Sequence, residues 1–189
     1  AAQMAVGLGA DVTILDRDPE VLEKVGTHFE ARASTRFSNA ANLYDAVTTA
    51  DLVIGAVLIP GAAAPKLVTR ETLKDMQKGA VLVDVAIDQG GCFETSRATT
   101  HADPTYVVDD VVHYCVANMP GAVARTSTYA LNNVTLPHAL RIARMGWKDA
   151  LAADPHLAEG LNVHKGEVTY EAVASELGYD YRPVADLLR

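Results

Sequence analysis

The stretch GADVTILDRD, residues 9–18, decides the fold that we predict for this chain. Its short apolar run ends in Asp16. An acid at the end of the second strand is typical of dinucleotide-binding folds, in which its carboxylate binds a ribose. In such folds the acid lies about 20 residues after a glycine-rich loop with the pattern G-x-G-x-x-G. The fifteen residues before Asp16 do not contain this pattern. We therefore predict a C-terminal fragment that begins just past its glycine loop.

Helical patterns lie on both sides of this predicted strand. Residues 1–9 have the alanine-rich composition of a buried helix, and Gly9 suits its C-terminal cap. Asp18 followed by Pro19 is typical of an N-cap and the first helical position, so a second helix is predicted to run to about Lys24.

The same alternation continues along the chain. We expect a weak strand over residues 31–37, a helix over residues 38–50 with Ser38 as its N-cap, and a strand over residues 51–58. A helix over residues 69–79, which ends at Gly79, and a further strand over residues 80–87 follow. The last two strands are continuous apolar runs, which are typical of parallel strands buried on both faces. Strands that alternate with helices predict an α/β fold, here an incomplete doubly wound (Rossmann) parallel sheet.

The pattern changes after residue 121, where strand–helix–strand units end. Residues 122–145 have helical character, with Pro137 as a kink or a break, and short helices follow. Residues 162–170 resemble a two-stranded ribbon with Lys165 and Gly166 in its turn, before a final helix. We therefore place a domain boundary between residues 121 and 122.

Composition excludes several classes of function. The net charge of −8, with acids and bases interspersed, disfavours nucleic acid as a partner. No apolar stretch reaches 18 residues, so no membrane span is predicted, and residues 1–10 lack the basic start of a signal peptide. Two cysteines are too few for a disulfide framework, which favours a reducing cytoplasm. The histidines lack metal-binding spacing, so no metal site is expected.

Two acids lie in or just after the apolar run 80–87. The alternation of a strand puts Asp84 and Asp88 on one face, so their spacing does not choose between them. Their positions along the run distinguish the two acids, because ligands of this fold bind outside the carboxyl ends of strands. Asp88 lies at the carboxyl end of this predicted strand, before Gly90 and Gly91, which let the backbone approach a ligand. We predict Asp88 to be functional and Asp84 to lie deep. Cys92 is interpreted as a small loop cysteine rather than a nucleophile.

Three long stretches carry a resemblance to a known family. They read ADLVIGAVLIPGAAAPKLV, VLVDVAIDQGGCFETSRATTH and YCVANMPGAVARTSTYALNN, and they resemble the alanine dehydrogenase family, which shares its fold with the first domain of proton-translocating transhydrogenase. The motif N-M-P-G-A-V-x-R-T-S-T favours alanine dehydrogenase. The resemblance implies that residues 1–121 form an NAD-binding domain. Residues 122–189 would be the C-terminal, helical return segment of the substrate domain.

The resemblance also implies a reaction and its site. The reaction is the reversible NAD-dependent oxidative deamination of L-alanine to pyruvate and ammonia, in a cytoplasmic homohexamer, and the fragment alone would be inactive. Asp16 would bind the adenosine ribose and repel the 2′-phosphate of NADP. Asp88 would be the catalytic acid and would also contact the cofactor. The further cofactor contacts implied are Ser38, Val57, Leu58, Val85, Ala86, Ile87, Arg97, Val116, Ala117, Asn118 and Met119.

Plainer interpretations stay open for several of these residues. Ser38 can be a helix cap as well as a contact, and Arg97 can form a loop salt bridge. Residues 116–121 can be a buried turn, and Lys66 is interpreted as a surface lysine. Two other functions also stay open: a non-catalytic NAD(H)-binding domain of the transhydrogenase type, and a truncated chain with only a partner-binding role.

Overall fold

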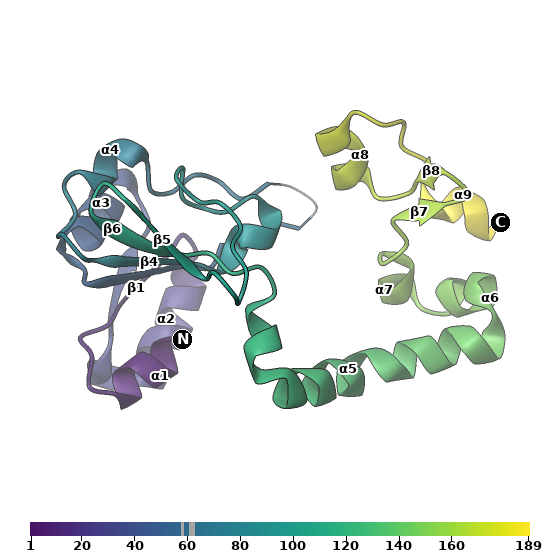
Figure 1. Cartoon of the computed structure of the whole chain (residues 1–189). Coiled ribbons are helices and arrows are strands. Elements are labelled where there is room, and N and C mark those ends of the chain that lie inside the picture. Colours follow the sequence, from purple (N-terminus) through teal and green to yellow (C-terminus); the bar gives the residue numbers. More distant parts are fainter. Residues whose placement is uncertain (58, 61–62) are drawn as a thin grey trace. The chain divides into compact units, whose positions relative to one another are not determined.

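The computed structural model of this chain describes residues 1–57, 59–60 and 63–189, and the chain forms two compact units (Figure 1). Unit 1 comprises residues 1–57 and 65–117. Unit 2 comprises residues 58–64 and 118–189.

Unit 1 is an α/β unit built on parallel strands. Its helices and strands in chain order are α1 (Ala2–Gly7), β1 (Thr13–Asp16), α2 (Pro19–Phe29), η1 (Glu30–Arg32), β2 (Ser34–Phe37), α3 (Ala40–Thr49), β3 (Leu52–Gly55), α4 (Arg70–Leu73), β4 (Val81–Asp84), η2 (Val85–Gln89), β5 (Thr105–Val108) and β6 (Val111–Tyr114). The η elements are 3₁₀ helices. The predicted α/β class with parallel strands is confirmed.

The strands form two sheets whose order fits a doubly wound fold. β1 pairs in parallel with β2. The second sheet has the order β3-β4-β6-β5, in which only β5 runs antiparallel to its neighbour. In the usual doubly wound order 3-2-1-4-5-6, one strand lies between the strands that correspond to β1 and β3. Within the described residues, β1 and β3 do not pair with each other.

Local capping explains where α2 and α3 begin. The Asp18 side chain accepts a hydrogen bond from the amide of Glu20 at 2.8 Å, and Pro19 occupies the first turn of α2 as predicted. The helix continues beyond the predicted end, to Phe29. The predicted cap of α3 was wrong by one residue, because Asn39 rather than Ser38 accepts a hydrogen bond from the helix.

Three predicted elements are shorter in the structure. α4 ends at Leu73 rather than at Gly79, and β3 ends at Gly55. β4 ends at Asp84, whose side chain accepts the amide of Ala86 and turns the chain into η2. Asp88 therefore lies on a 3₁₀ helix, and the argument that strand alternation places it on one face with Asp84 was wrong.

The structure adds a hairpin that we did not predict and exposes a helix that we expected to be buried. β5 and β6 are joined at Asp109 and Asp110, which both have positive φ, the backbone that tight hairpin turns require. α1 has no buried residue, although its composition predicted burial. Gly9 has the expected left-handed backbone after it.

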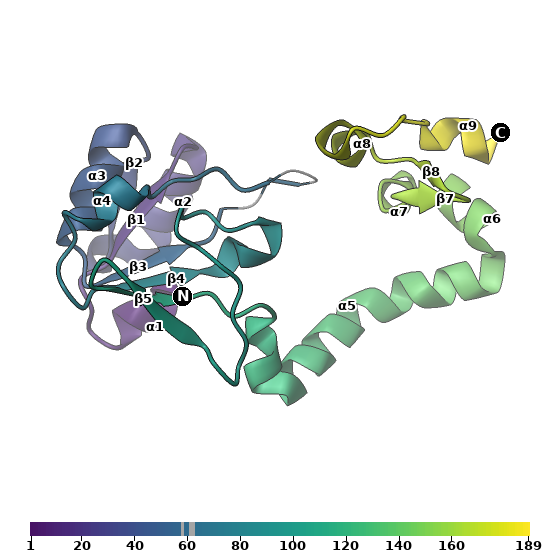
Figure 2. The same cartoon turned by 45° about the horizontal axis from the view of Figure 1, so that its top comes forward.

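Unit 2 consists of helices and one small ribbon. Its elements are η3 (Met119–Val123), α5 (Ala124–Met145), α6 (Trp147–Ala152), α7 (Pro155–Ala158), β7 (Val163–His164), β8 (Glu167–Val168), α8 (Glu171–Leu177) and α9 (Val184–Leu188). The ribbon turns at Lys165 and Gly166 as predicted. Pro137 does not break α5, which continues through it (Figure 2). None of the helices in the described part of the chain is long and apolar enough to cross a membrane.

Candidate functional site

Asp16, which was predicted to bind the ribose, and Ser38, a predicted cofactor contact, meet at the carboxyl ends of β1 and β2. Asp16 is the last residue of β1, and Ser38 directly follows β2. The amide of Ser38 donates to the carbonyl oxygen of Asp16 at 2.8 Å. The carboxylate atom Oδ1 of Asp16 accepts the amide of Asp18 at 2.9 Å. Among the described residues the other oxygen, Oδ2, has no hydrogen-bond partner and is free to accept donors from a ligand.

The second predicted group, residues 85–88, directly follows the inner strand β4. Ala86 and Ile87 are buried, whereas Val85 and Asp88 are exposed. β4 runs parallel to β3 and β6, so this turn lies at the carboxyl edge of the second sheet. Open α/β sheets bind ligands at this edge, and there Asp88 is presented to solvent.

The buried side chain of Asp84 holds this turn through hydrogen bonds. Its side chain is fully buried at 0% exposure. One carboxyl oxygen accepts the hydroxyl of Ser96 at 2.5 Å and the amide of Cys92 at 2.9 Å. The other accepts the amide of Ala86 at 3.0 Å. Asp84 therefore joins the start of the turn to its end, and its bonds go to the protein rather than to a ligand.

Gly91 is required by the close approach of this network. A Cβ atom on Gly91 would lie 2.6 Å from Cβ of Ser96 and 2.7 Å from the carboxyl oxygen Oδ2 of Asp84. The backbone of Gly91 also has a φ of 75°, in the left-handed region that favours glycine. Gly91 therefore serves the packing of the turn around Asp84. A Cβ atom on Gly90 would meet no atom within 4 Å, so this glycine supplies only the left-handed backbone, with a φ of 84°.

Cys92 fits its interpretation as a loop cysteine. Its side chain is fully buried. Burial, and then the neighbouring Asp84, raise the pKa of its thiol to about 12. Because the thiolate is the nucleophilic form, the thiol is poorly suited to covalent catalysis at neutral pH.

The other predicted contacts have different surroundings. Val57 is half-buried two residues past β3, and Leu58 lies outside the described residues. Val116 is buried after β6, and the amide of Ala117 donates to Thr99. Asn118 and Met119 begin the second segment of unit 2, and Asn118 has a left-handed backbone with a φ of 59°.

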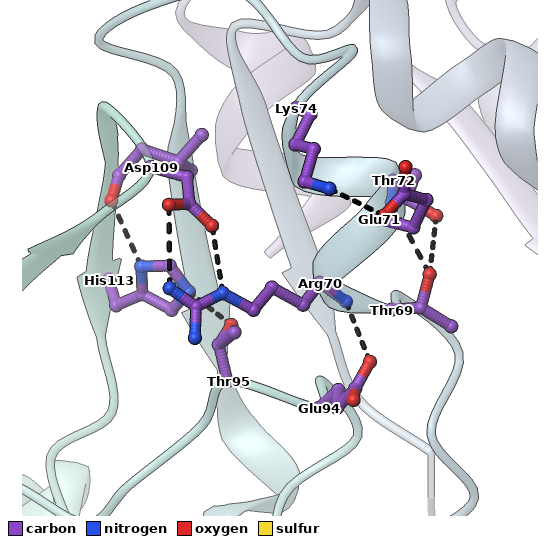
Figure 3. Close-up of polar contacts among 10 residues, drawn as sticks. Thr69, Arg70, Glu71, Thr72, Lys74, Glu94, Thr95, Asp109 and His113 are labelled. Carbon is purple, nitrogen blue, oxygen red and sulfur yellow. Dashed lines mark hydrogen bonds and ion pairs between the residues drawn. The ribbon is translucent and has the colours of Figure 1, made fainter.

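Arg97 lies beside the edge strand β5. Its guanidinium group stacks on the ring of Tyr106 at 4.0 Å, and its amide donates to the hydroxyl of Tyr106. It shares an open hollow of about 340 Å³ with Arg70, Glu94, Thr95, Tyr106 and Val108. Arg70 pairs with Asp109, which precedes the start of β6 (Figure 3). This hollow therefore extends toward the amino end of β6, and it is not the carboxyl edge that carries Asp88.

His113 is a buried titratable group behind this hollow. Its ring atom Nδ1 donates to the carbonyl of Val111, and the hydroxyl of Thr95 donates to Nε2 at 2.7 Å (Figure 3). Both bonds suit a neutral imidazole. The ring also stacks on Tyr106. Burial lowers the pKa of His113 below its ordinary value of 6.5.

We expect the stability of the protein to fall as the pH drops below 6.5, through His113. The unfolded chain takes up a proton near its ordinary pKa of 6.5, whereas the folded state resists protonation. This contribution is complete above pH 6.5 and is lost toward the lower pKa of the folded state. Its slope is at most about 1.4 kcal/mol per pH unit. Urea unfolding between about pH 7.5 and 5.5 should show the loss, and His113→Gln should remove it from the profile. Identical slopes in both proteins would contradict this role.

Lys66, which the sequence analysis interpreted as a surface lysine, is exposed and also contacts the turn. Its ammonium group donates to the carbonyl oxygens of Gly90 at 2.6 Å and Gly91 at 2.7 Å. These partners lie 24 and 25 residues further along the chain. No local pattern around Lys66 could have predicted them.

The strand order and the acids at the carboxyl edge define unit 1 as a domain of the doubly wound α/β class. The family model described as "Alanine dehydrogenase/PNT, C-terminal domain" matches residues 1–171. The chain belongs to this family.

Its relatives give the same assignment. An alanine dehydrogenase of Halomonas elongata is 62% identical over 188 residues, which cover 100% of this chain and 51% of that protein. An alanine dehydrogenase of Mycolicibacterium smegmatis is 54% identical with the same coverage. The chain thus spans about half the length of the curated relatives it matches.

Solved structures rank the two branches of the family. A structure of L-alanine dehydrogenase superposes with a TM-score of 0.83 and 50% identity, over 94% of this chain and 49% of that one. A transhydrogenase from Sinorhizobium meliloti gives a TM-score of 0.63 and 31% identity, over 89% and 45%. The likeness to transhydrogenase is the weaker of the two.

Proposed function

We propose that this chain carries the NAD-binding domain of an alanine dehydrogenase, which catalyses the reversible oxidative deamination of L-alanine to pyruvate and ammonia. The observation that carries the proposal is the exposed Asp88 on a turn fixed at the carboxyl end of β4, in a chain of this family. The greater likeness to alanine dehydrogenase than to transhydrogenase supports it.

The residues at the end of β1 fit the adenosine part of NAD. Asp16 is oriented by its bond to the amide of Asp18, and its Oδ2 atom can accept the ribose hydroxyls. The same carboxylate repels a 2′-phosphate, which favours NAD over NADP. The backbone of Ser38 is held beside Asp16 by its hydrogen bond, which supports Ser38 as a contact of the same part of the cofactor.

NAD, when bound, supplies the acceptor for the hydride that leaves the substrate Cα. Asp88 would act as a general acid–base group that takes a proton and polarises the reacting water or amine. The exposure of Asp88 suits this role, because a proton must pass to and from the group. The remaining cofactor contacts in the proposal are Val57, Leu58, Val85, Ala86, Ile87, Arg97, Val116, Ala117, Asn118 and Met119.

The wider assignment is also part of the proposal. Residues 1–121 would form the NAD-binding domain, and residues 122–189 would belong to the substrate domain. The full-length enzyme would be a cytoplasmic homohexamer of amino-acid catabolism. Light scattering on the purified full-length protein would test the hexamer.

The test of function uses a full-length form, in which this chain is joined to the remainder that its curated relatives carry. Alanine-dependent formation of NADH, followed by absorbance, is the expected result. NADH binding without turnover of alanine would favour a transhydrogenase-type binding domain. Isothermal titration that shows no NADH binding would leave only a partner-binding role.

We expect Asp16→Ala to weaken NAD binding by about 1–3 kcal/mol, the usual cost of losing hydrogen bonds to a charged group. The substitution should also relax the rejection of NADP, because the repelling charge is gone while Arg17 remains beside it. Titration of both cofactors into the full-length form measures the two effects. Asp11→Ala, on an exposed acid before β1, is the matched control. If neither the affinity for NAD nor the preference over NADP changed, Asp16 would not be the ribose acid.

A further inference from the structure

The turn that carries Asp88 is held by the side chain of Asp84, which precedes it and accepts the amides of Ala86 at its start and Cys92 after its end. The segment starts after β4, passes through η2 and bends at Gly90 and Gly91, whose φ angles are 84° and 75°. At its start, the buried Asp84 accepts the amide of Ala86. The amides of Gly90 and Gly91 are used within the turn, where they donate to Ile87 and Ala86.

The carbonyl groups of the two glycines face a different partner. Their oxygen atoms accept hydrogen bonds from the ammonium group of Lys66 at 2.6 Å and 2.7 Å. Hydrogen bonds from a charged donor are stronger than neutral ones. A single group therefore binds two consecutive carbonyls at the point where the chain reverses.

The backbone that carries Lys66 is itself fixed against the segment after the turn. The amide of Leu67 donates to the carbonyl of Cys92 at 2.7 Å, and the amide of Glu94 donates to the carbonyl of Val68 at 2.8 Å. Val68 is buried at 1% exposure. Lys66 thus extends from an anchored segment, although its own side chain is accessible to solvent.

We propose that Lys66 is a positioning residue, which holds the carbonyls of Gly90 and Gly91 and thereby fixes the turn that presents Asp88 to the substrate. The proposal rests on the proposed function, because Lys66 affects the reaction only if Asp88 takes part in it. Without this cation, the two carbonyls would exchange their bonds for water and the end of the turn would move more freely.

Hydrogen–deuterium exchange tests the positioning without measuring turnover. In Lys66→Met of the full-length form, the amides of residues 90–92 should exchange at least about tenfold faster, the equivalent of one lost hydrogen bond to a charged group. Lys66→Arg, which keeps the charge and the donors, should restore slow exchange. Lys78→Met is the matched control, because Lys78 is an exposed lysine that pairs with Asp110, away from the turn. Exchange in Lys66→Met equal to that in the control would overturn the proposal.

Kinetics separate positioning from general stability. A loosened turn should lower kcat by up to about 100-fold, the cost of misplacing a reacting group by about 1 Å. The KM for NAD should change much less than kcat, because the proposed ribose site at Asp16 lies outside the turn. Normal kcat with fast exchange would overturn the link to Asp88. If instead Asp88→Asn were fully active, the proposed function would fail, and the exchange data would still decide whether Lys66 holds the turn.

Discussion

Replacing Asp88 by Asn should lower the kcat of the full-length form by about 10²–10⁴, the usual contribution of a general acid–base group. Asparagine keeps the shape of the side chain but neither carries the charge nor accepts a proton at neutral pH. The affinity for NADH should change far less, because binding rests mainly on Asp16 and backbone contacts. Steady-state assays with L-alanine and titration of NADH measure the two quantities.

Asp103→Asn is the matched control for this prediction. Asp103 is an exposed acid of the same unit, on the loop before β5. Its substitution therefore removes the same charge at a position that has no proposed role in catalysis. A fast Asp88→Asn enzyme would show that another group moves the proton. Asp84 is a poor candidate for this other proton-transfer group, because its carboxyl oxygens already accept hydrogen bonds from Cys92, Ser96 and Ala86.

Local chemistry explains which parts of the fold could be predicted. Asp18 and Pro19 begin α2 because a cap and the first turn involve only neighbouring residues. The turn at Lys165 and Gly166 was predicted for the same reason. The end of β4 was missed because a continuous apolar run does not show where a strand stops. Asp84 stops it by a bond to the amide two residues on, a pattern that acids in turns commonly form.

Contacts between distant parts of the chain limited the prediction of the site. The place of Asp16 followed from its position after an apolar run, but its neighbour Ser38 was identified only through the family resemblance. The hairpin of β5 and β6 could have been found, because Asp109 and Asp110 separate two apolar pairs of valines. The contact of Lys66 with the turn could not have been predicted, because exposed lysines are common and its partners are remote in sequence.

The largest loss of stability should follow from Asp84→Ala. The substitution removes a buried group that accepts the amides of Ala86 and Cys92 and the hydroxyl of Ser96. Each buried donor left without a partner costs about 1–3 kcal/mol. We expect the free energy of unfolding to fall by about 3–5 kcal/mol, a large part of the total for a typical domain. Urea unfolding of the full-length form, followed by fluorescence and by circular dichroism, measures this loss.

A graded series of variants distinguishes the network from the volume of the side chain. Asp84→Asn keeps one oxygen acceptor and nearly the same size, so its loss should lie between those of Asp84→Ala and the native protein. Ser96→Ala removes one donor and leaves the acceptor with its other partners, so it should cost only about 1 kcal/mol. Asp103→Ala, on an exposed loop, should change stability by less than about 0.5 kcal/mol. Equal losses for Asp84→Ala and Asp103→Ala would mean that the donors around Asp84 find other partners, and that the turn does not depend on this buried acid.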